Sequence, residues 1–230
     1  MITGAGRGIG RALACAFAGQ GAIVAANDIN PLGLENTLAD VAALGGRAGE
    51  YLFDVAKRMP VQALVDQVLD EWGRIDILIN NAAVEPVADL LDMDEWDWHR
   101  TLDVNLGGPF FAMQHVGRAM RSQGGGVIVN MAAADSYLYG RSKRSAFSAG
   151  KAGLVSLTRY AAQELAPYNI RVLAVCPAAV DTESLRLAKD FAIQPPPLHL
   201  LQAEDVAKVV LELCRPTNTA TGEVVEIQPA

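Results

Sequence analysis

Short apolar runs alternate with longer mixed segments along most of this chain. The apolar runs predict strands, and two of them, around residues 76–80 and 127–131, have the continuous hydrophobic character of strands buried on both faces. The longer segments between the runs are typical of helices. The predicted strands are Ala22–Ala26, Ala48–Phe53, Ile75–Ile79, Val127–Asn130, Arg171–Val175 and Val224–Ile227, and the predicted helices include Gly10–Gly19, Val61–Trp72, Glu95–Arg121, Ala149–Ala166 and Ala203–Cys214.

Regular alternation of strand and helix predicts an α/β fold, in which crossover helices cover both faces of a parallel sheet. The 230 residues show no repeat, charged linker or low-complexity tract, so one domain over residues 1–230 is expected. One irregular stretch, Thr182–Gln202, is apolar and broken by Pro195–Pro197. This stretch is interpreted either as a lid over a substrate or as a surface helix packed on the core.

Composition and net charge argue against several classes of partner. The net charge of −7 argues against nucleic acid or an anionic membrane as a partner. No apolar run reaches the ~18 residues of a membrane span, and no signal peptide is visible, so a cytoplasmic protein is expected. Three cysteines far apart in the sequence fit reduced thiols, and the three histidines match no metal-binding spacing, so no metal site is expected.

The segment Thr3–Gly10 reads TGAGRGIG and runs directly into a predicted helix. Glycines 4, 8 and 10 permit a tight turn from strand to helix and a close approach of the backbone to a pyrophosphate. The helix start then offers unpaired N–H groups and the positive end of its dipole. Thr3, Gly4, Arg7, Gly8, Ile9 and Gly10 are therefore candidate cofactor-binding residues.

Asp28 follows the next strand at nearly the spacing expected for a carboxylate that binds the adenosine ribose. A carboxylate accepts hydrogen bonds from ribose hydroxyls and repels a 2′-phosphate. Asp28 therefore favours NAD over NADP, and Arg7 in the turn argues weakly for NADP.

Further motifs follow in a characteristic order: Asp54 in FDV, NNAA at 80–83, Asn105 in DVNLGG, GGVIVNM at 125–131, Lys151 in AGKAG, and CPAAVDT at 176–182. With these motifs nearly the whole chain resembles the short-chain dehydrogenase/reductase family. The resemblance implies a Rossmann-type parallel sheet of seven strands and a homodimer or homotetramer. Only Met1 and Ile2 precede Thr3, so the central first strand is either truncated or begins upstream of this sequence.

The resemblance also implies roles for individual residues. Asp54 and Val55 would border the adenine, and Asn80 to Ala82 would line the cofactor ribose. Asn105 would hold a catalytic water in a helix kink, and Lys151 would bind the nicotinamide ribose and lower the pKa of a neighbouring tyrosine. Pro177, Val180 and Thr182 would lie at the carboxamide end of the cofactor.

The sequence departs from the family pattern where that pattern places its reacting hydroxyls. Phe147 stands four residues before Lys151, in the place of the general acid/base tyrosine, and Ala133 stands in the place of the partner serine. Tyr139 and Lys143 form a literal YxxxK string, but the spacing from Lys151 to the following strand fits the family and the spacing from Lys143 does not. Tyr139, or a hydroxyl near it, is a candidate substitute proton donor.

Three functions are compatible with these residues. The first is an NAD-dependent oxidoreductase acting on a secondary alcohol or carbonyl of apolar character, with a substituted or impaired proton relay. The second is a catalytically inactive homologue that binds NAD as a regulatory or scaffold subunit. The third is a non-redox enzyme on the same scaffold that uses Lys151 or Asn105 differently.

Overall fold

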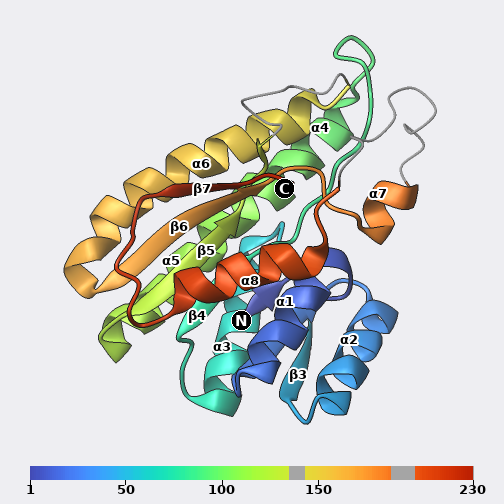
Figure 1. Cartoon of the computed structure of the whole chain (residues 1–230). Coiled ribbons are helices and arrows are strands. Elements are labelled where there is room, and N and C mark those ends of the chain that lie inside the picture. The colour runs from blue at the N-terminus through green and yellow to red at the C-terminus, as the bar shows by residue number, and fades with distance from the viewer. Residues whose placement is uncertain (135–142, 188–199, 230) are drawn as a thin grey trace.

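The computed structural model describes residues 1–134, 143–187 and 200–229 (Figure 1). Seven parallel strands form one sheet in the order β3-β2-β1-β4-β5-β6-β7, which confirms the predicted Rossmann-type α/β fold. The strands are β1 (Ile2–Thr3), β2 (Ile23–Asp28), β3 (Arg47–Leu52), β4 (Ile77–Asn80), β5 (Gly126–Met131), β6 (Ile170–Pro177) and β7 (Val224–Ile227).

Helices cover both faces of the sheet, and two hydrophobic layers fill the space between. One layer joins the sheet to α1, α2 and α8, and the other joins it to α3, α5 and α6. The helices are α1 (Gly8–Gly19), α2 (Pro31–Ala43), α3 (Arg58–Trp72), α4 (Glu95–Leu102), α5 (Gly108–Gln123), α6 (Ser145–Leu165), α7 (Glu183–Leu187) and α8 (Ala203–Cys214), with a π-helix η1 (Asp103–Gly107) and a 3₁₀ turn η3 (Ala166–Tyr168).

The single helix predicted over Glu95–Arg121 is three consecutive elements, α4, η1 and α5. The wide π turn of η1 lets the Asn105 side chain bond the loop that follows β4. Gly108 then lies directly against the backbone of Val55. A Cβ at Gly108 would lie only 2.9 Å from the Val55 carbonyl oxygen, so a larger residue would not fit there without a shift. The kink inferred for Asn105 from the family resemblance is therefore present.

Helix α2 was not among the predicted helices, although its start carries recognisable signals. The Asn30 side chain accepts a hydrogen bond from the Gly33 N–H at 3.2 Å, and Pro31 occupies the first turn, where its missing N–H costs nothing.

Strand β1 has two residues and lies in the middle of the sheet. Ile2 pairs with Ala26 of β2 on one side and with Ile79 of β4 on the other. The Met1 amino group donates to the Ile77 carbonyl oxygen at 2.8 Å, and burial lowers the pKa of this amine to about 5.

Connections from β1 run outward to β2 and β3 and then return to β4 on the other side of β1. The strand order therefore reverses between β1 and β4. In open parallel sheets a reversal of this kind leaves a crevice beyond the carboxyl ends of the strands, where ligands bind.

Candidate functional site

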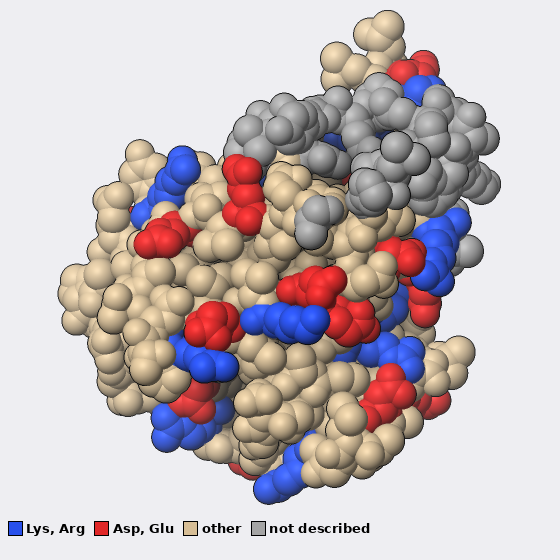
Figure 2. Space-filling view, in the orientation of Figure 1, with Lys and Arg blue, Asp and Glu red and all other residues tan. Residues whose placement is uncertain are grey.

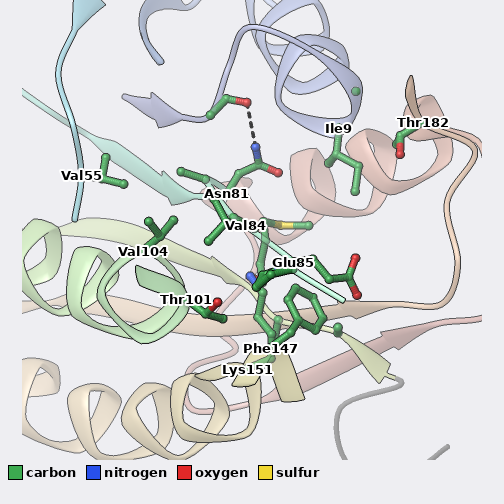
Figure 3. A pocket seen from close by; sticks show the side chains of 18 of the residues that line it. Ile9, Val55, Asn81, Val84, Glu85, Thr101, Val104, Phe147, Lys151 and Thr182 are labelled. Atoms are coloured by element: carbon green, nitrogen blue, oxygen red, sulfur yellow. Dashed lines mark hydrogen bonds between the residues drawn. The ribbon is translucent and has the colours of Figure 1, made fainter. Parts of the chain in front are cut away.

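A cleft of about 1040 Å³ lies beyond the carboxyl ends of the strands (Figure 3). Its size is that of a site for a ligand as large as a dinucleotide. We call its two ends the β2–β3 end and the β5–β6 end. The β2–β3 end is lined by Arg7, Asp28, Ile29, Phe53, Asp54 and Arg100, and the β5–β6 end by Glu85, Ala132, Ala133, Arg144, Phe147, Ser148, Lys151 and Pro177.

The glycine turn between β1 and α1 forms the middle of the cleft. Gly4 and Gly8 have positive φ angles of 65° and 53°, which side chains with a Cβ rarely adopt. A Cβ at Gly10 would lie 2.0 Å from the Gly4 carbonyl oxygen, so only glycine fits there. No side chain caps the start of α1 at Arg7, which leaves the first N–H groups of the helix for a ligand.

A hydrogen-bond network ties this turn to the end of β4. The Thr3 hydroxyl accepts from the Asn81 and Ala82 N–H groups at 3.0 and 3.1 Å, and the Asn81 amide donates to the Thr3 and Gly4 carbonyl oxygens, both at 3.0 Å. Figure 3 shows Asn81 beneath the turn. The backbone of the turn is therefore fixed before any ligand arrives.

Asn80 lies beside this network and behind the wall of the cleft. Its side chain is buried and donates to the side-chain amide oxygen of Asn130 at 2.8 Å, and the Asn130 amide in turn donates to the Thr158 hydroxyl. Asn81 and Ala82 line the cleft. Asn80 thus holds β4 to β5 and is not among the residues that line the cleft, and the ribose contact inferred for Asn80 to Ala82 stays a prediction.

Asp28 ends β2 and faces the cleft. Its carboxylate accepts three backbone N–H groups: Gly6 at 2.9 Å, Ile29 at 2.8 Å and Asn30 at 3.1 Å. A Cβ at Gly6 would lie 2.9 Å from an Asp28 carboxylate oxygen, so Gly6, which sequence reasoning did not single out, is required by this carboxylate.

Asp54 lies next to Asp28 in the β2–β3 end, with Val55 buried beside it. Burial alone would raise the pKa of Asp54, but the Ala56 N–H and the Arg100 guanidinium outweigh it and hold this pKa below its usual value. Arg100 donates to both carboxylate oxygens, at 3.2 and 3.0 Å. Arg100 was missed at the sequence level because it is distant in the chain and belongs to no motif.

Asn105 is fully buried in η1, and its amide bonds both backbone groups of Val84. It donates to the Val84 carbonyl oxygen at 2.7 Å and accepts from the Val84 N–H at 3.2 Å. This pairing fixes the loop that carries Glu85 into the cleft. The catalytic water inferred for Asn105 stays a prediction.

Lys151 belongs to α6 and is 3% exposed. Its ammonium donates to the Met131 carbonyl oxygen at 2.6 Å and lies 5.6 Å from the centre of the Phe147 ring. Burial lowers the pKa of Lys151 to about 8, and coulombic interactions with Glu85 and Cys176 raise it only in part. A lysine with a pKa near 8 can exchange a proton at physiological pH.

Phe147 lies one helical turn before Lys151 and faces the same cleft as Ala133. Glu85 reaches this end from the β4–α4 loop and forms an ion pair with Arg144 at the start of α6. Figure 3 shows Glu85, Phe147 and Lys151 gathered together. Glu85, Arg144 and Ser148 were not singled out in the sequence. Only the fold brings Glu85 to Lys151, whereas Arg144 and Ser148 precede Lys151 at the start of α6. Tyr139 lies outside the described residues.

Pro177, Val180 and Thr182 follow β6 and line the cleft beside the glycine turn. The Thr182 methyl would lie 3.3 Å from a Cβ at Gly8, and its hydroxyl accepts from the Leu185 N–H at the start of α7. Of the predicted lid Thr182–Gln202, α7 places Leu185 on the cleft, and residues 188–199 lie outside the described residues. The lid stays a prediction.

Charge on the surface is mixed. In Figure 2, acidic and basic side chains alternate over the visible face and do not gather into a basic patch. Among the described residues, no helix has both the length and the apolarity to cross a membrane. Within the same residues, no group of three or more His, Cys, Asp or Glu is arranged to hold a metal ion.

Residues 1–191 match the family model described as short chain dehydrogenase. The chain is 37% identical to the 3-oxoacyl-acyl-carrier-protein reductase FabG of Thermotoga maritima, covering 99% of this chain and 94% of that one. It is 40% identical to a sorbitol dehydrogenase of Cereibacter sphaeroides over 80% of this chain and 70% of that one. A crystal structure of a short-chain type dehydrogenase/reductase from Mycobacterium marinum superposes with a TM-score of 0.92 at 33% identity, over 99% of this chain and 92% of that one.

Proposed function

The chain belongs to the short-chain dehydrogenase/reductase family, and from this we propose that it is an NAD-dependent oxidoreductase acting on a secondary alcohol or carbonyl compound through a non-standard proton relay. The observation that carries the proposal is the single cleft at the carboxyl ends of the strands, which the glycine turn, Asp28 and Asp54 all line. Related chains carry oxidoreductase names, among them a D-threitol dehydrogenase and a sorbitol dehydrogenase.

The residues present fit a nicotinamide dinucleotide. The glycine turn offers helix N–H groups to its pyrophosphate, and Gly10 leaves no room for a side chain that would block that approach. The bound cofactor would supply the hydride donor or acceptor. Lys151, Pro177, Val180 and Thr182 would contact the nicotinamide half, and Val55 with Asp54 the adenine.

Asp28 supports NAD over NADP. Its carboxylate is held in place by three backbone N–H groups where the adenosine ribose would lie. The 2′-phosphate of NADP would lie against this carboxylate and be repelled by it. Arg7 at the same end of the cleft is the group that would favour NADP.

Titration with NADH and NADPH, read by the fluorescence of the reduced nicotinamide, tests this choice. We expect saturable binding of NADH with at least ~10-fold weaker binding of NADPH, since a close like charge costs about 1.4 kcal/mol or more. The Asp28→Ser variant should narrow or reverse the ratio, and Arg7→Ala should widen it. Equal affinities in the unmodified protein would contradict the NAD assignment, and no binding of either would contradict the whole proposal.

The β5–β6 end of the cleft, where the substrate would bind, has a lining that supports a largely apolar substrate. Ala132, Ala133, Phe147 and Leu185 supply apolar wall, and the Glu85–Arg144 pair supplies its charged edge. A screen of secondary alcohols and ketones of graded polarity, followed at the absorbance of NADH, tests this proposal. Turnover confined to charged or strongly polar substrates would contradict it.

Phe147 and Ala133 also favour a second function, a cofactor-binding homologue without turnover. Neither side chain carries a proton to exchange. If this function holds, NADH binds normally while the whole substrate screen stays silent. The two functions therefore differ in turnover and agree in binding.

We extend the proposal to a cytoplasmic homodimer or homotetramer. The widely spaced cysteines of the sequence support a reducing compartment. Exposed Phe110, Tyr160 and Tyr168 on α5, α6 and η3 support a covered surface in the assembly. Light scattering on the eluting protein measures the assembly, and a monomer would contradict it.

A further inference from the structure

We propose that the Lys151 amine is itself the acid–base group of the reaction, exchanging a proton directly with the oxygen of the substrate. This inference rests on the proposed oxidoreductase function and names its proton donor. It assigns Lys151 more than the cofactor contact and charge that the family resemblance implies.

The first support is position. Lys151 lines the β5–β6 end of the cleft, and a hydrogen bond from its ammonium to the Met131 carbonyl oxygen fixes the side chain there. One such bond leaves two N–H groups for other partners. The neighbour one turn earlier is Phe147, whose ring lies under the ammonium and offers no competing acid or base.

The second support is the set of titratable groups around the amine. Glu85 comes from the loop after β4 and is engaged by Arg144, and Cys176 comes from β6. Glu85 raises the pKa of Lys151 without cancelling the effect of burial, so this pKa stays near 8. Both forms of the amine are then populated near neutral pH, as an acid–base group requires.

Other described groups at this end are less suited. Arg144 cannot release a proton near neutral pH. The Ser148 hydroxyl lines the cleft and can pass a proton on, but it holds no proton in excess. Glu85 is engaged in the ion pair with Arg144.

The step balances as follows. In reduction, a bound nicotinamide cofactor would supply the hydride to the carbonyl carbon. As the C=O π pair moves to oxygen, the N–H bond at Nζ breaks and the O–H bond forms. Lys151 is left as a neutral amine and regains its proton from water. In oxidation, the neutral amine takes the hydroxyl proton, and the bound cofactor would accept the hydride.

The sign of the pH dependence follows from these forms. Reduction needs the ammonium, so its rate is present below pH 8 and falls as the pH rises through about 8. Oxidation needs the free amine and rises over the same interval. A charge-only role for Lys151 predicts no such opposition.

The first test needs neither cofactor nor turnover. The chain has few lysines, Lys57, Lys143, Lys151, Lys189 and Lys208, so isotope-labelled lysine side chains can be followed one by one by NMR as the pH is raised. Lys151→Met identifies the signal. We expect Lys151 to titrate near 8, and Lys208, whose pKa is raised by Asp205, to titrate above its ordinary value. A midpoint for Lys151 at or above 10 would overturn the proposal.

The second test changes the acidity of the amine. Lys151→Cys treated with 2-bromoethylamine carries a thialysine, which is a more acidic amine of similar length. The midpoints of both pH–rate profiles should move to lower pH, and wild-type protein treated in the same way controls for modification at Cys15. Unmoved midpoints would overturn the proposal.

Lys151→Arg keeps a cation but cannot release its proton. Turnover should fall by ~10²–10⁴-fold while NADH still binds. Retained turnover would overturn the proposal. Loss of turnover in Tyr137→Phe or Tyr139→Phe, together with unmoved thialysine profiles, would assign the proton relay to the hydroxyl removed. Absence of turnover in the wild type would overturn both this inference and the oxidoreductase, whereas the results above would overturn this inference alone.

Discussion

At the β2–β3 end of the cleft, carboxylates are held by backbone N–H groups and by Arg100, whereas at the β5–β6 end a buried amine lies between apolar side chains and an ion pair. Asp28 accepts three N–H groups, and Asp54 accepts from Arg100. Lys151 lies beside Phe147, and the Glu85–Arg144 pair lines the same end. Under the proposed function, binding of the adenosine half of the cofactor and proton transfer are assigned to separate groups, so one can change while the other is kept.

Breaking the shared glycine turn should have the largest effect. Gly10→Ala places a Cβ 2.0 Å from the Gly4 carbonyl oxygen, and because both groups are backbone, the turn itself must move. We expect a loss of at least ~3 kcal/mol in the free energy of unfolding, or loss of NADH binding in any folded protein. Urea unfolding and NADH titration measure the two quantities.

Gly19→Ala is the matched control, because no atom lies within 4 Å of a Cβ there and the residue belongs to the same helix. Gly19→Ala should leave NADH binding unchanged and slightly raise the free energy of unfolding. Equal behaviour of the two variants would show that the close packing of the turn is not what holds the ligand.

The next largest effect is expected when the serine and tyrosine hydroxyls of the family pattern are introduced at the β5–β6 end. In the double variant Ala133→Ser, Phe147→Tyr, a tyrosine hydroxyl would lie near the Lys151 ammonium, which favours its ionised form. We expect turnover to rise by ~10²-fold at pH 7 with little change in NADH affinity, since general acid–base groups contribute factors of this size. Steady-state rates on the best substrate of the screen measure the gain, and unchanged turnover would show that this end lacks more than hydroxyls.

A smaller effect is expected at the ion pair beside Lys151. Glu85→Gln removes the carboxylate that raises the pKa of Lys151, so this pKa should fall below about 8. Reductive turnover would then be lost at a lower pH, with a decrease of about threefold at pH 8. Asp89→Asn is the control, since Asp89 pairs with Lys143 in the same loop contact. Equal shifts of the pH–rate profile in both variants would contradict the assignment of this effect on the Lys151 pKa to Glu85.

The smallest effect is expected at Asp54. Its folded-state pKa is depressed, so the pair with Arg100 stabilises the protein above the unfolded pKa and ceases to do so as the pH falls through the folded one. Because both side chains are about a quarter exposed, Asp54→Asn should cost only ~0.5–1 kcal/mol at pH 7 and less near pH 3. Denaturant unfolding at both pH values tests this, with Asp76→Asn in an exposed pair with Arg74 as the comparison.

Most of the fold was predictable because apolar runs and helical segments are local patterns. Strand β7 and helix α8 have the predicted bounds, while the helix predicted over Glu95–Arg121 is divided by η1. That division depends on Val84, a distant residue whose backbone pairs with Asn105. A periodic pattern carries no information about such a partner.

The candidate site was predictable where one motif holds all its parts, as in the glycine turn. Arg100, Glu85 and Arg144 were missed because each acquires its place only through folding. Asn80 was placed on the cleft because its motif is read as a unit, but alternation along a strand sends neighbouring side chains to opposite sides. Its amide bonds Asn130, and Asn81 takes the position beneath the turn.

The bonds from Asn81 to the Thr3 and Gly4 carbonyl oxygens also set an order of events during synthesis. The turn leaves the ribosome before its hydrogen-bond partners, which follow only after β2, β3 and β4 have been made. Because distant parallel pairings form late, the nascent turn has no fixed shape until then. A nucleotide added during translation would therefore stabilise chains that have already passed Asn81, and would leave shorter ones as susceptible to proteolysis as before.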